Sequence, residues 1–388
     1  MPVADEPADL KVLVGSPGAG LLPGPDLPDG TLLLDLGPDH PSRAGLLELD
    51  LWLSDDHATI RAADVRVGAL HRGVEKLFEV RDYRQVLMLA NRHDWHAPFA
   101  GELVVALAVE DLLGLVVPER AVLLRMVLAE HTRISSHLGF LGWPARRIGD
   151  LAPLHPIREQ LRIQLLALTG NRVHPMITRL GGLAIDAGEA WLTNEVTATA
   201  AAAHWATELL SAMDTETPVA PGITPVTTEV IEGYGLSGPV ARAAGIDLDV
   251  RRLSPYLDYA GHPPPTTPPV ANDAPGRLRQ LAAEVATSAE LIRTLVDRLA
   301  DTPEPVEVPL PKVIKAPEAE TYVATEAPLG RAGCHLVSRG QATPWRLRLR
   351  TPSAATVSAL PAILPGCPVP ELEGALASLG YVVGDVDK

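Results

Sequence analysis

The sequence predicts an α+β fold, with a central helical bundle and small antiparallel sheets on its flanks. Two patterns carry this prediction. Hydrophobic and polar residues alternate around residue 50 and again around residue 348, as they do in half-buried strands. Between these regions, hydrophobic residues recur at three- and four-residue spacing, as on one face of a helix. A chain of 388 residues, 46% of them hydrophobic, is long enough to bury a large core.

The first strands are expected soon after the N-terminal segment. From Gly45 to Leu53 leucines alternate with other residues, which is the period of a strand with one buried face. A second extended run, Ala58 to Val67, follows the turn at residues 54–56, so the two runs predict a small antiparallel sheet. Residues 1–30 are rich in Pro, Gly and Asp and are expected to form a loose arm.

Four long helices are expected in the middle of the chain. Pro118 opens the first, which continues to about Leu138 before the glycines at 139 and 142 end it. The other three are expected over Ile157–Leu168, Glu189–Met213 and Arg277–Leu299. Near the C-terminal end, Cys334–Val337 and Arg346–Arg350 are expected to pair as a hairpin.

These elements divide the chain into five predicted regions. They are a loose arm (1–30), an N-terminal β region (31–70), a helical core (71–302), a proline-rich surface crossing (303–322) and a C-terminal α+β region (323–388).

Composition excludes several classes of protein. The net charge of -15 argues against binding nucleic acid or anionic lipid through a basic face. Only Cys334 and Cys367 are present, which is too few for a disulfide-stapled secreted domain and fits a reducing cytoplasm. No signal peptide is expected, and the apolar segment Leu103–Val117 is too short to span a bilayer. Any association with a membrane is therefore expected to be peripheral.

Few residues suggest chemistry by themselves. The glycines between Gly15 and Gly20 lack the Lys-Ser/Thr of a phosphate loop. His93 and His96 could begin a metal site, but without a third ligand a hydrogen-bonded role is favoured, and no metal is predicted. Glu130, Arg133 and His137 share one helix face. They are expected to form a buried polar network, with direct chemistry as the less favoured alternative.

Several longer motifs then occur in order between Gly37 and Lys388. Leu70-His-Arg-Gly-Val-Glu-Lys76 is similar to Leu-His-Arg-Gly-Ile-Glu-Lys, and Glu130-His-Thr-Arg-Ile-Ser-Ser-His-Leu138 to Glu-Leu-x-Arg-Ile-x-Ser-His-Leu. Thr169-Gly-Asn-Arg-Val-His174 and the terminal Gly384-Asp-Val-Asp-Lys388 are similar to Thr-Gly-x-Arg-x-His and Gly-x-Val-Asp-Arg. Through this series of motifs the chain resembles the D subunit of respiratory complex I, the 49-kDa family related to the [NiFe]-hydrogenase large subunit. Its departures from the family motifs suggest that it is a divergent second paralogue.

The resemblance implies a fold like that of the hydrogenase large subunit and a place inside a multi-subunit NADH–quinone oxidoreductase. There the chain is expected to lie peripherally at the cytoplasmic face of the cell membrane, beside a cluster-bearing B-type, a C-type and a membrane-embedded H-type subunit. By the same resemblance it is expected to form one wall of the pocket for quinone (ubiquinone or menaquinone), in an enzyme that couples electron transfer from NADH to proton translocation. The iron–sulfur cluster and the NADH site are expected in partner subunits. This chain lacks the Cys-x-x-Cys pairs of a hydrogenase, and is expected to hold no cofactor and to be inactive alone.

Carried over position by position, the resemblance implies two groups of site residues. Arg92 and His174 match positions that approach the partner's terminal cluster, where cationic or hydrogen-bonding groups raise its potential. Their alternative roles are an ion pair with Asp94 and a satisfied core histidine.

The quinone side departs from the family pattern. His40 is retained from the opening Gly-Pro-Gln-His-Pro-x-x-His motif, whose second histidine is Ala44 here. The proton-donating tyrosine and the acid behind the histidine align with Trp95 and Arg147. Alanine donates nothing, an indole N–H does not titrate and an arginine is a fixed cation. Two interpretations stay open: a working member of the family that holds quinone in a modified way, or a degenerate structural or assembly paralogue that binds none.

Overall fold

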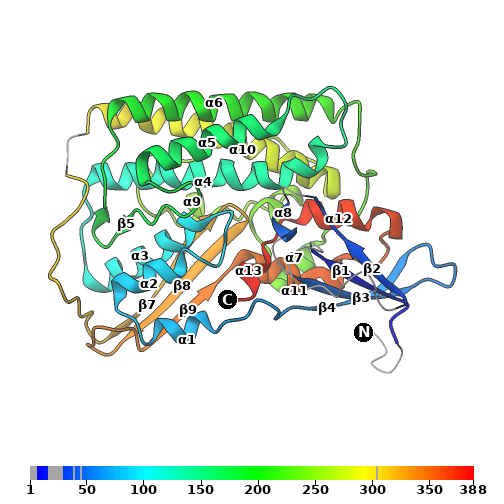
Figure 1. The fold of residues 1–388 in the computed structure, drawn as a ribbon, viewed down its shortest axis with the longest axis horizontal. Coiled ribbons are helices and arrows are strands. Elements are labelled where there is room, and N and C mark those ends of the chain that lie inside the picture. Colours follow the sequence, from blue (N-terminus) through cyan, green and yellow to red (C-terminus); the bar gives the residue numbers. More distant parts are fainter. Residues whose placement is uncertain (1–6, 16–28, 38–39, 44–45, 303–304) are drawn as a thin grey trace.

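The computed structural model describes residues 7–15, 29–37, 40–43, 46–302 and 305–388. A layer of long helices lies along one side, and two sheets with shorter helices lie along the other (Figure 1). Mixed helices and small sheets confirm the predicted α+β class.

The long helices form the predicted bundle. Helices α4 (Glu119–Ala145), α6 (Glu189–Ala212) and α10 (Ala274–Ala300) pack against one another, and α5 (Leu154–Thr169) packs against α6 (Figure 1). The predicted end of α4 is wrong, because the helix continues through Gly139 and Gly142 to Ala145. A glycine weakens a helix without ending it, and a Cβ at Gly139 would lie 2.5 Å from the His96 ring. This glycine therefore makes room for a neighbouring side chain.

The C-terminal sheet has the antiparallel order β7-β8-β9, with β7 at Ala319–Ala327, β8 at Gly330–Ser338 and β9 at Arg346–Arg350. The predicted hairpin is the β8–β9 pair, while β7 begins inside the segment expected to be a proline-rich crossing. Helices α1 (Val74–Phe78), α2 (Tyr83–Ala90) and α3 (Pro98–Leu113) lie beside this sheet (Figure 1).

The N-terminal sheet has the order β2-β1-β3-β4. Strands β3 (Leu47–Leu53) and β4 (Ile60–Arg66) form the predicted antiparallel pair. The expected loose arm contains β1 (Leu10–Val14), which pairs with β3 on one side and runs parallel to β2 (Thr31–Leu34) on the other. The expectation failed there because Val12 and Val14 bury their side chains fully once both neighbouring strands are in place. The sheet therefore contains both parallel and antiparallel pairs of strands. The boundaries of the five regions predicted from the sequence stay a prediction.

Short elements complete the described chain. They are β5 (Thr178–Arg179), β6 (Gly182–Leu183), α7 (Thr228–Tyr234), α8 (Gly238–Ala243), α9 (Val250–Leu253), α11 (Pro352–Ile363), α12 (Leu372–Leu379), α13 (Val383–Val386) and 3-10 turns at Pro41–Arg43 and Val369–Glu371.

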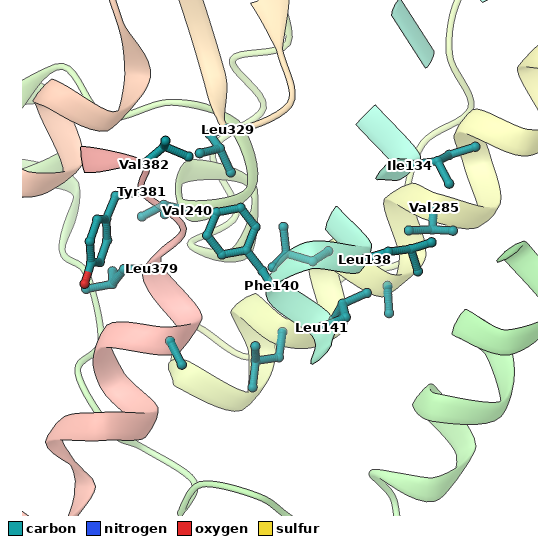
Figure 2. Close-up of a cluster of buried hydrophobic side chains, with 14 of the residues drawn as sticks. Ile134, Leu138, Phe140, Leu141, Val240, Val285, Leu329, Leu379, Tyr381 and Val382 are labelled. Carbon is teal, nitrogen blue, oxygen red and sulfur yellow. The ribbon is translucent and has the colours of Figure 1, made fainter. Parts of the chain in front are cut away.

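The core joins the bundle to the C-terminal elements. Figure 2 shows Val240 of α8, Tyr381 and Val382 on one side of Phe140 of α4, and Leu141 on the other side. No described helix is both long enough and apolar enough to cross a bilayer.

Candidate functional site

The segment between α2 and α3, residues 91–97, carries side chains of both predicted site groups. Its backbone is irregular, so side chains must satisfy its polar groups. Asp94 Oδ1 accepts hydrogen bonds from the backbone N–H groups of His96 (2.9 Å) and Ala97 (3.0 Å). His93 Nδ1 lies 2.8 Å from Asp385 Oδ1, which ties the segment to α13. The segment is therefore fixed at several points.

The structure brings Arg92 and His174 close together, and their cluster-facing role stays a prediction. His174 Nδ1 donates a hydrogen bond to Asn91 Oδ1 (2.7 Å), and Arg92 Nη2 lies 3.3 Å from the Met176 sulfur. Burial and the nearby Arg92 cation lower the pKa of His174. His174 is accordingly harder to protonate than an ordinary histidine, and it lies beside the exposed guanidinium of Arg92.

A buried carboxylate holds the loop that carries His174. Glu102 is fully buried in α3 and accepts hydrogen bonds from the side chain of Asn91 and from the backbone N–H groups of Met176 (2.8 Å) and Thr178 (3.0 Å). Met176 has a φ of 45°, which is uncommon for a residue other than glycine. Glu102 thus stabilises a strained loop conformation next to the Arg92 face.

Trp95 lines a partly open cavity of about 90 Å³. The cavity lies between the 91–97 segment, α4, α5 and the loop after α5. The Trp95 ring packs so closely on Gly384 that a Cβ there would lie 2.1 Å from it. The polar side chains of the wall are those of His96, His131, Thr132, Ser135, Arg158, Arg162 and Arg172. The cavity is therefore rich in donors and cations.

Two titratable groups of the 91–97 segment have strongly shifted pKa values. Burial and the cation of Arg158 lower the pKa of His96 to about 3, so this cavity histidine is neutral. Burial and the neighbouring Asp385 raise the pKa of Asp94 to about 7. Asp94 therefore changes protonation near neutral pH.

The other predicted quinone residues lie away from this cavity. His40 is buried, with Nδ1 2.7 Å from the Ser42 hydroxyl, and burial lowers its pKa to about 3. Phe140 contacts both the His40 and the His96 rings, with centroids 5.4 and 6.1 Å away. Arg147 pairs with Glu373 and stacks on Trp143. Ala44 lies outside the described residues.

Glu130, Arg133 and His137 lie in a buried polar network, in agreement with the favoured interpretation. Glu130 accepts hydrogen bonds from Arg133 (3.1 Å), Arg251 (2.9 Å), Tyr259 (2.7 Å) and Ser288 (2.7 Å). Burial alone would raise its pKa, but the two guanidinium groups hold it at about 2.

The same network continues toward α10. His137 Nε2 lies 3.0 Å from Glu284, and Arg242 bridges Glu284 and Glu326 at 2.8 Å each. Its members come from α4, α8, α9, α10 and β7, so the network fixes these elements relative to one another.

Among the described residues, no group of three or more His, Cys, Asp or Glu side chains is placed to hold a metal ion. His93 contacts Asp385, whereas His96 packs against Phe140. Sequence reasoning missed His131 and Arg158 at the cavity, and Glu195 behind His131. The one sequence feature that pointed to any of them is at position 131, where this chain has histidine and the motif of the related family has leucine.

Fold and site together define the class: a helix-rich α+β chain in which one short segment connects a cationic surface to a polar cavity. The family model of the respiratory-chain NADH dehydrogenase 49-kDa subunit matches residues 154–314 and 308–388. The chain belongs to this family, that of the D subunits of NADH–quinone oxidoreductases, and is thus one component of an oxidoreductase.

Three relatives illustrate the match. The D 2 subunit of the NADH-quinone oxidoreductase of Salinispora tropica is 45% identical over 98% of each chain. The D 1 subunit of the same enzyme of Streptomyces coelicolor is 43% identical, over 92% of this chain and 95% of the relative. NADH-quinone oxidoreductase subunit 4 of Thermus thermophilus is 33% identical, over 92% of this chain and 94% of the relative.

Proposed function

We propose that this chain forms one wall of the quinone pocket in an NADH–quinone oxidoreductase, next to the terminal iron–sulfur cluster of a B-type subunit. The observation that carries the proposal is the 91–97 segment. Within four residues it presents Arg92 at the surface beside His174, and Trp95 in the cavity wall. An electron-donating cluster and its quinone acceptor need neighbouring sites of this kind, because electrons pass between them over short distances.

Partner chains are proposed to cover the surface around the cavity. Ile163 and Leu166 of α5 and Val173 of the following loop are each 40–41% exposed, and other residues of α5 and Val173 itself line the cavity. Exposed apolar side chains next to a polar cavity are typical of surfaces that partners bury. A B-type subunit fits this face, and C-type and membrane H-type subunits complete the peripheral assembly at the cytoplasmic face of the cell membrane.

The pocket is proposed to hold the quinone in a modified way. Trp95 offers a large flat ring and an N–H donor where the family has tyrosine, so it can stack on and orient a head group without supplying a proton. Arg147 is paired with Glu373 outside the cavity wall, so it places no unpaired cation against the quinone. The coupling of NADH oxidation to proton translocation would follow from the whole complex.

The test is an affinity purification from gently solubilised membranes, followed by two assays on one preparation. NADH-driven reduction of a short-chain quinone reports the pocket, and NADH-driven ferricyanide reduction reports the upstream subunits. We expect partner subunits to copurify and quinone to be reduced. The Trp95→Ala variant is expected to lower quinone reduction by about tenfold. Trp345→Ala, which removes an exposed indole stacked on Arg339, should leave both rates unchanged.

A complex that assembles and reduces ferricyanide but not quinone would refute the proposal. That outcome would identify the chain as the structural paralogue. Copurification without any of the cluster-bearing subunits would refute the proposed position as well.

A further inference from the structure

We infer that His131, backed by Glu195, is the side chain that delivers a proton to a quinone oxygen in the Trp95 cavity. The inference rests on the proposed function and adds a catalytic residue to it. It follows from three observations: the ring lines the cavity, a buried carboxylate holds the ring, and the residues aligned with the usual proton donors cannot titrate there.

The first observation is the position of the imidazole. His131 extends from the middle of α4 into the same cavity wall as Trp95 and is only 3% exposed. Its Nδ1 atom lies 2.8 Å from Glu195 Oε1. A carboxylate only accepts hydrogen bonds, so Nδ1 carries the proton of this bond. The other ring nitrogen, Nε2, is the one left for the cavity.

The second observation is the isolation of the carboxylate. Glu195 lies in α6, is fully buried, and contributes no atom to the cavity wall. Its Oε2 atom has no hydrogen-bond partner among the described residues, so its charge acts mainly on His131. A buried carboxylate beside an imidazole stabilises the imidazolium form and fixes the ring orientation. The pair therefore has the geometry of a histidine that donates from Nε2 with an acid behind it.

The third observation is the lack of another donor of this kind in the wall. His96 also lines the cavity, but the low pKa of His96 keeps its ring neutral. The Trp95 indole does not titrate, and arginines hold their protons at any physiological pH. Among the described residues, the other charged and titratable groups that line the cavity or contact its lining residues are Glu195 of α6, Arg158, Glu159 and Arg162 of α5, and Asp94, His96 and Arg172 of the loops.

The proposed step balances as follows. Two electrons from NADH, delivered through the partner subunits, reduce the quinone ring. One carbonyl oxygen takes the proton from His131 Nε2, so that an N–H bond breaks, an O–H bond forms and the imidazole becomes neutral. Water supplies the second proton, and solvent reprotonates Nε2 through the open side of the cavity. The cavity of about 90 Å³ is smaller than the ~150 Å³ that holds benzene in an engineered protein core, so the head group would enter by its edge.

The test uses the purified complex with His131→Leu, which carries the residue of the related motif. Quinone reduction is expected to fall by about a hundredfold, while subunit composition and ferricyanide reduction stay the same. Glu195→Gln keeps an acceptor for Nδ1–H and should lower the rate by roughly tenfold, with the alkaline limb of the pH profile shifted to lower pH. His204→Leu, in the exposed His204–Glu208 pair of α6, is the matched control and should change nothing.

The outcomes separate the two proposals. If the wild-type complex reduces quinone and His131→Leu does so at the same rate and with the same pH profile, this inference is wrong and the proposed function stands. If the wild-type complex reduces no quinone, both are wrong. The double variant His131→Leu/Glu195→Gln covers the case in which a lone buried carboxylate prevents folding. It should assemble and show the same loss; full activity in it would also overturn the inference.

Discussion

Replacing Glu130 with glutamine would test how much the buried network contributes to stability. The carboxylate is fully buried and its pKa is held at about 2, against 4.5 for an ordinary glutamate. That difference corresponds to about 3 kcal/mol of folding free energy at neutral pH. A similar range, about 3–5 kcal/mol, is typical when one partner of a buried ion pair is removed. Glu130→Gln should therefore lower the free energy of unfolding by about 3 kcal/mol.

The chain contains a matched control for this prediction. Glu290 and Arg293 repeat the three-residue spacing of Glu130 and Arg133 on the exposed face of α10, with a 2.7 Å contact. Glu290→Gln should cost no more than about 0.5 kcal/mol, because solvent screens an exposed pair. Urea unfolding of each purified chain, followed by tryptophan fluorescence at pH 7, measures both values.

The pH dependence provides a second check. The pKa of Glu130 is lower in the folded chain than in the unfolded chain, so its contribution is complete above pH 4.5 and is lost as the pH falls toward 2. The difference in free energy of unfolding between wild type and Glu130→Gln should thus be constant from pH 7 to about pH 5 and become smaller at lower pH. A variant as stable as wild type at pH 7, or a gap that does not change down to pH 3, would refute this reasoning.

Four further predictions follow from individual contacts. Asp94→Asn should stabilise the fold above pH 7, because the pKa of Asp94 is raised in the folded chain and its contribution to the free energy of unfolding is lost as the pH rises through 7. Unfolding measured at pH 8.5 and at pH 4 should show a more stable variant only at the higher pH. Gly139→Ala should cost about 1–3 kcal/mol because the new methyl group meets His96, as thermal unfolding would show. Gly233→Ala, in α7 with open space around it, should instead add about 0.4–1 kcal/mol. His174→Ala should lower the midpoint potential of the partner's cluster in a redox titration followed by electron paramagnetic resonance, and an unchanged potential would contradict the proposed position.

Local patterns in the sequence were enough to predict two strand pairs and the four long helices α4, α5, α6 and α10. The leucine alternation in β3 and the helical spacing in α4, α5, α6 and α10 each depend on residues close together in the chain. Strand β1 was missed because it is only five residues long, and its burial depends on strands that come later in the sequence. The end of α4 was misplaced because the reason for Gly139 is the His96 ring on a distant segment.

The candidate site was predictable in part for the same reason. Glu130, Arg133 and His137 share a face at helical spacing, so their association could be expected. Their partner Arg251 comes from a point more than a hundred residues away, and only the folded chain identifies it. The pairing of His131 with Glu195 is equally long-range, since α6 brings the carboxylate behind the ring.

The segment 91–97 connects the surface at Arg92 with the cavity at Trp95. Arg92 and Trp95 are three positions apart, and side chains on α3 and α13 hold the side chains of their neighbours Asn91 and His93. A movement that enlarged the cavity at Trp95 would therefore have to displace Arg92 with it, or break one of these hydrogen bonds. We therefore expect occupancy of the cavity to change the electrostatic environment at Arg92. In the assembly proposed above, an acceptor that enters the cavity on one side of this segment would change the surroundings of the proposed electron donor on the other side.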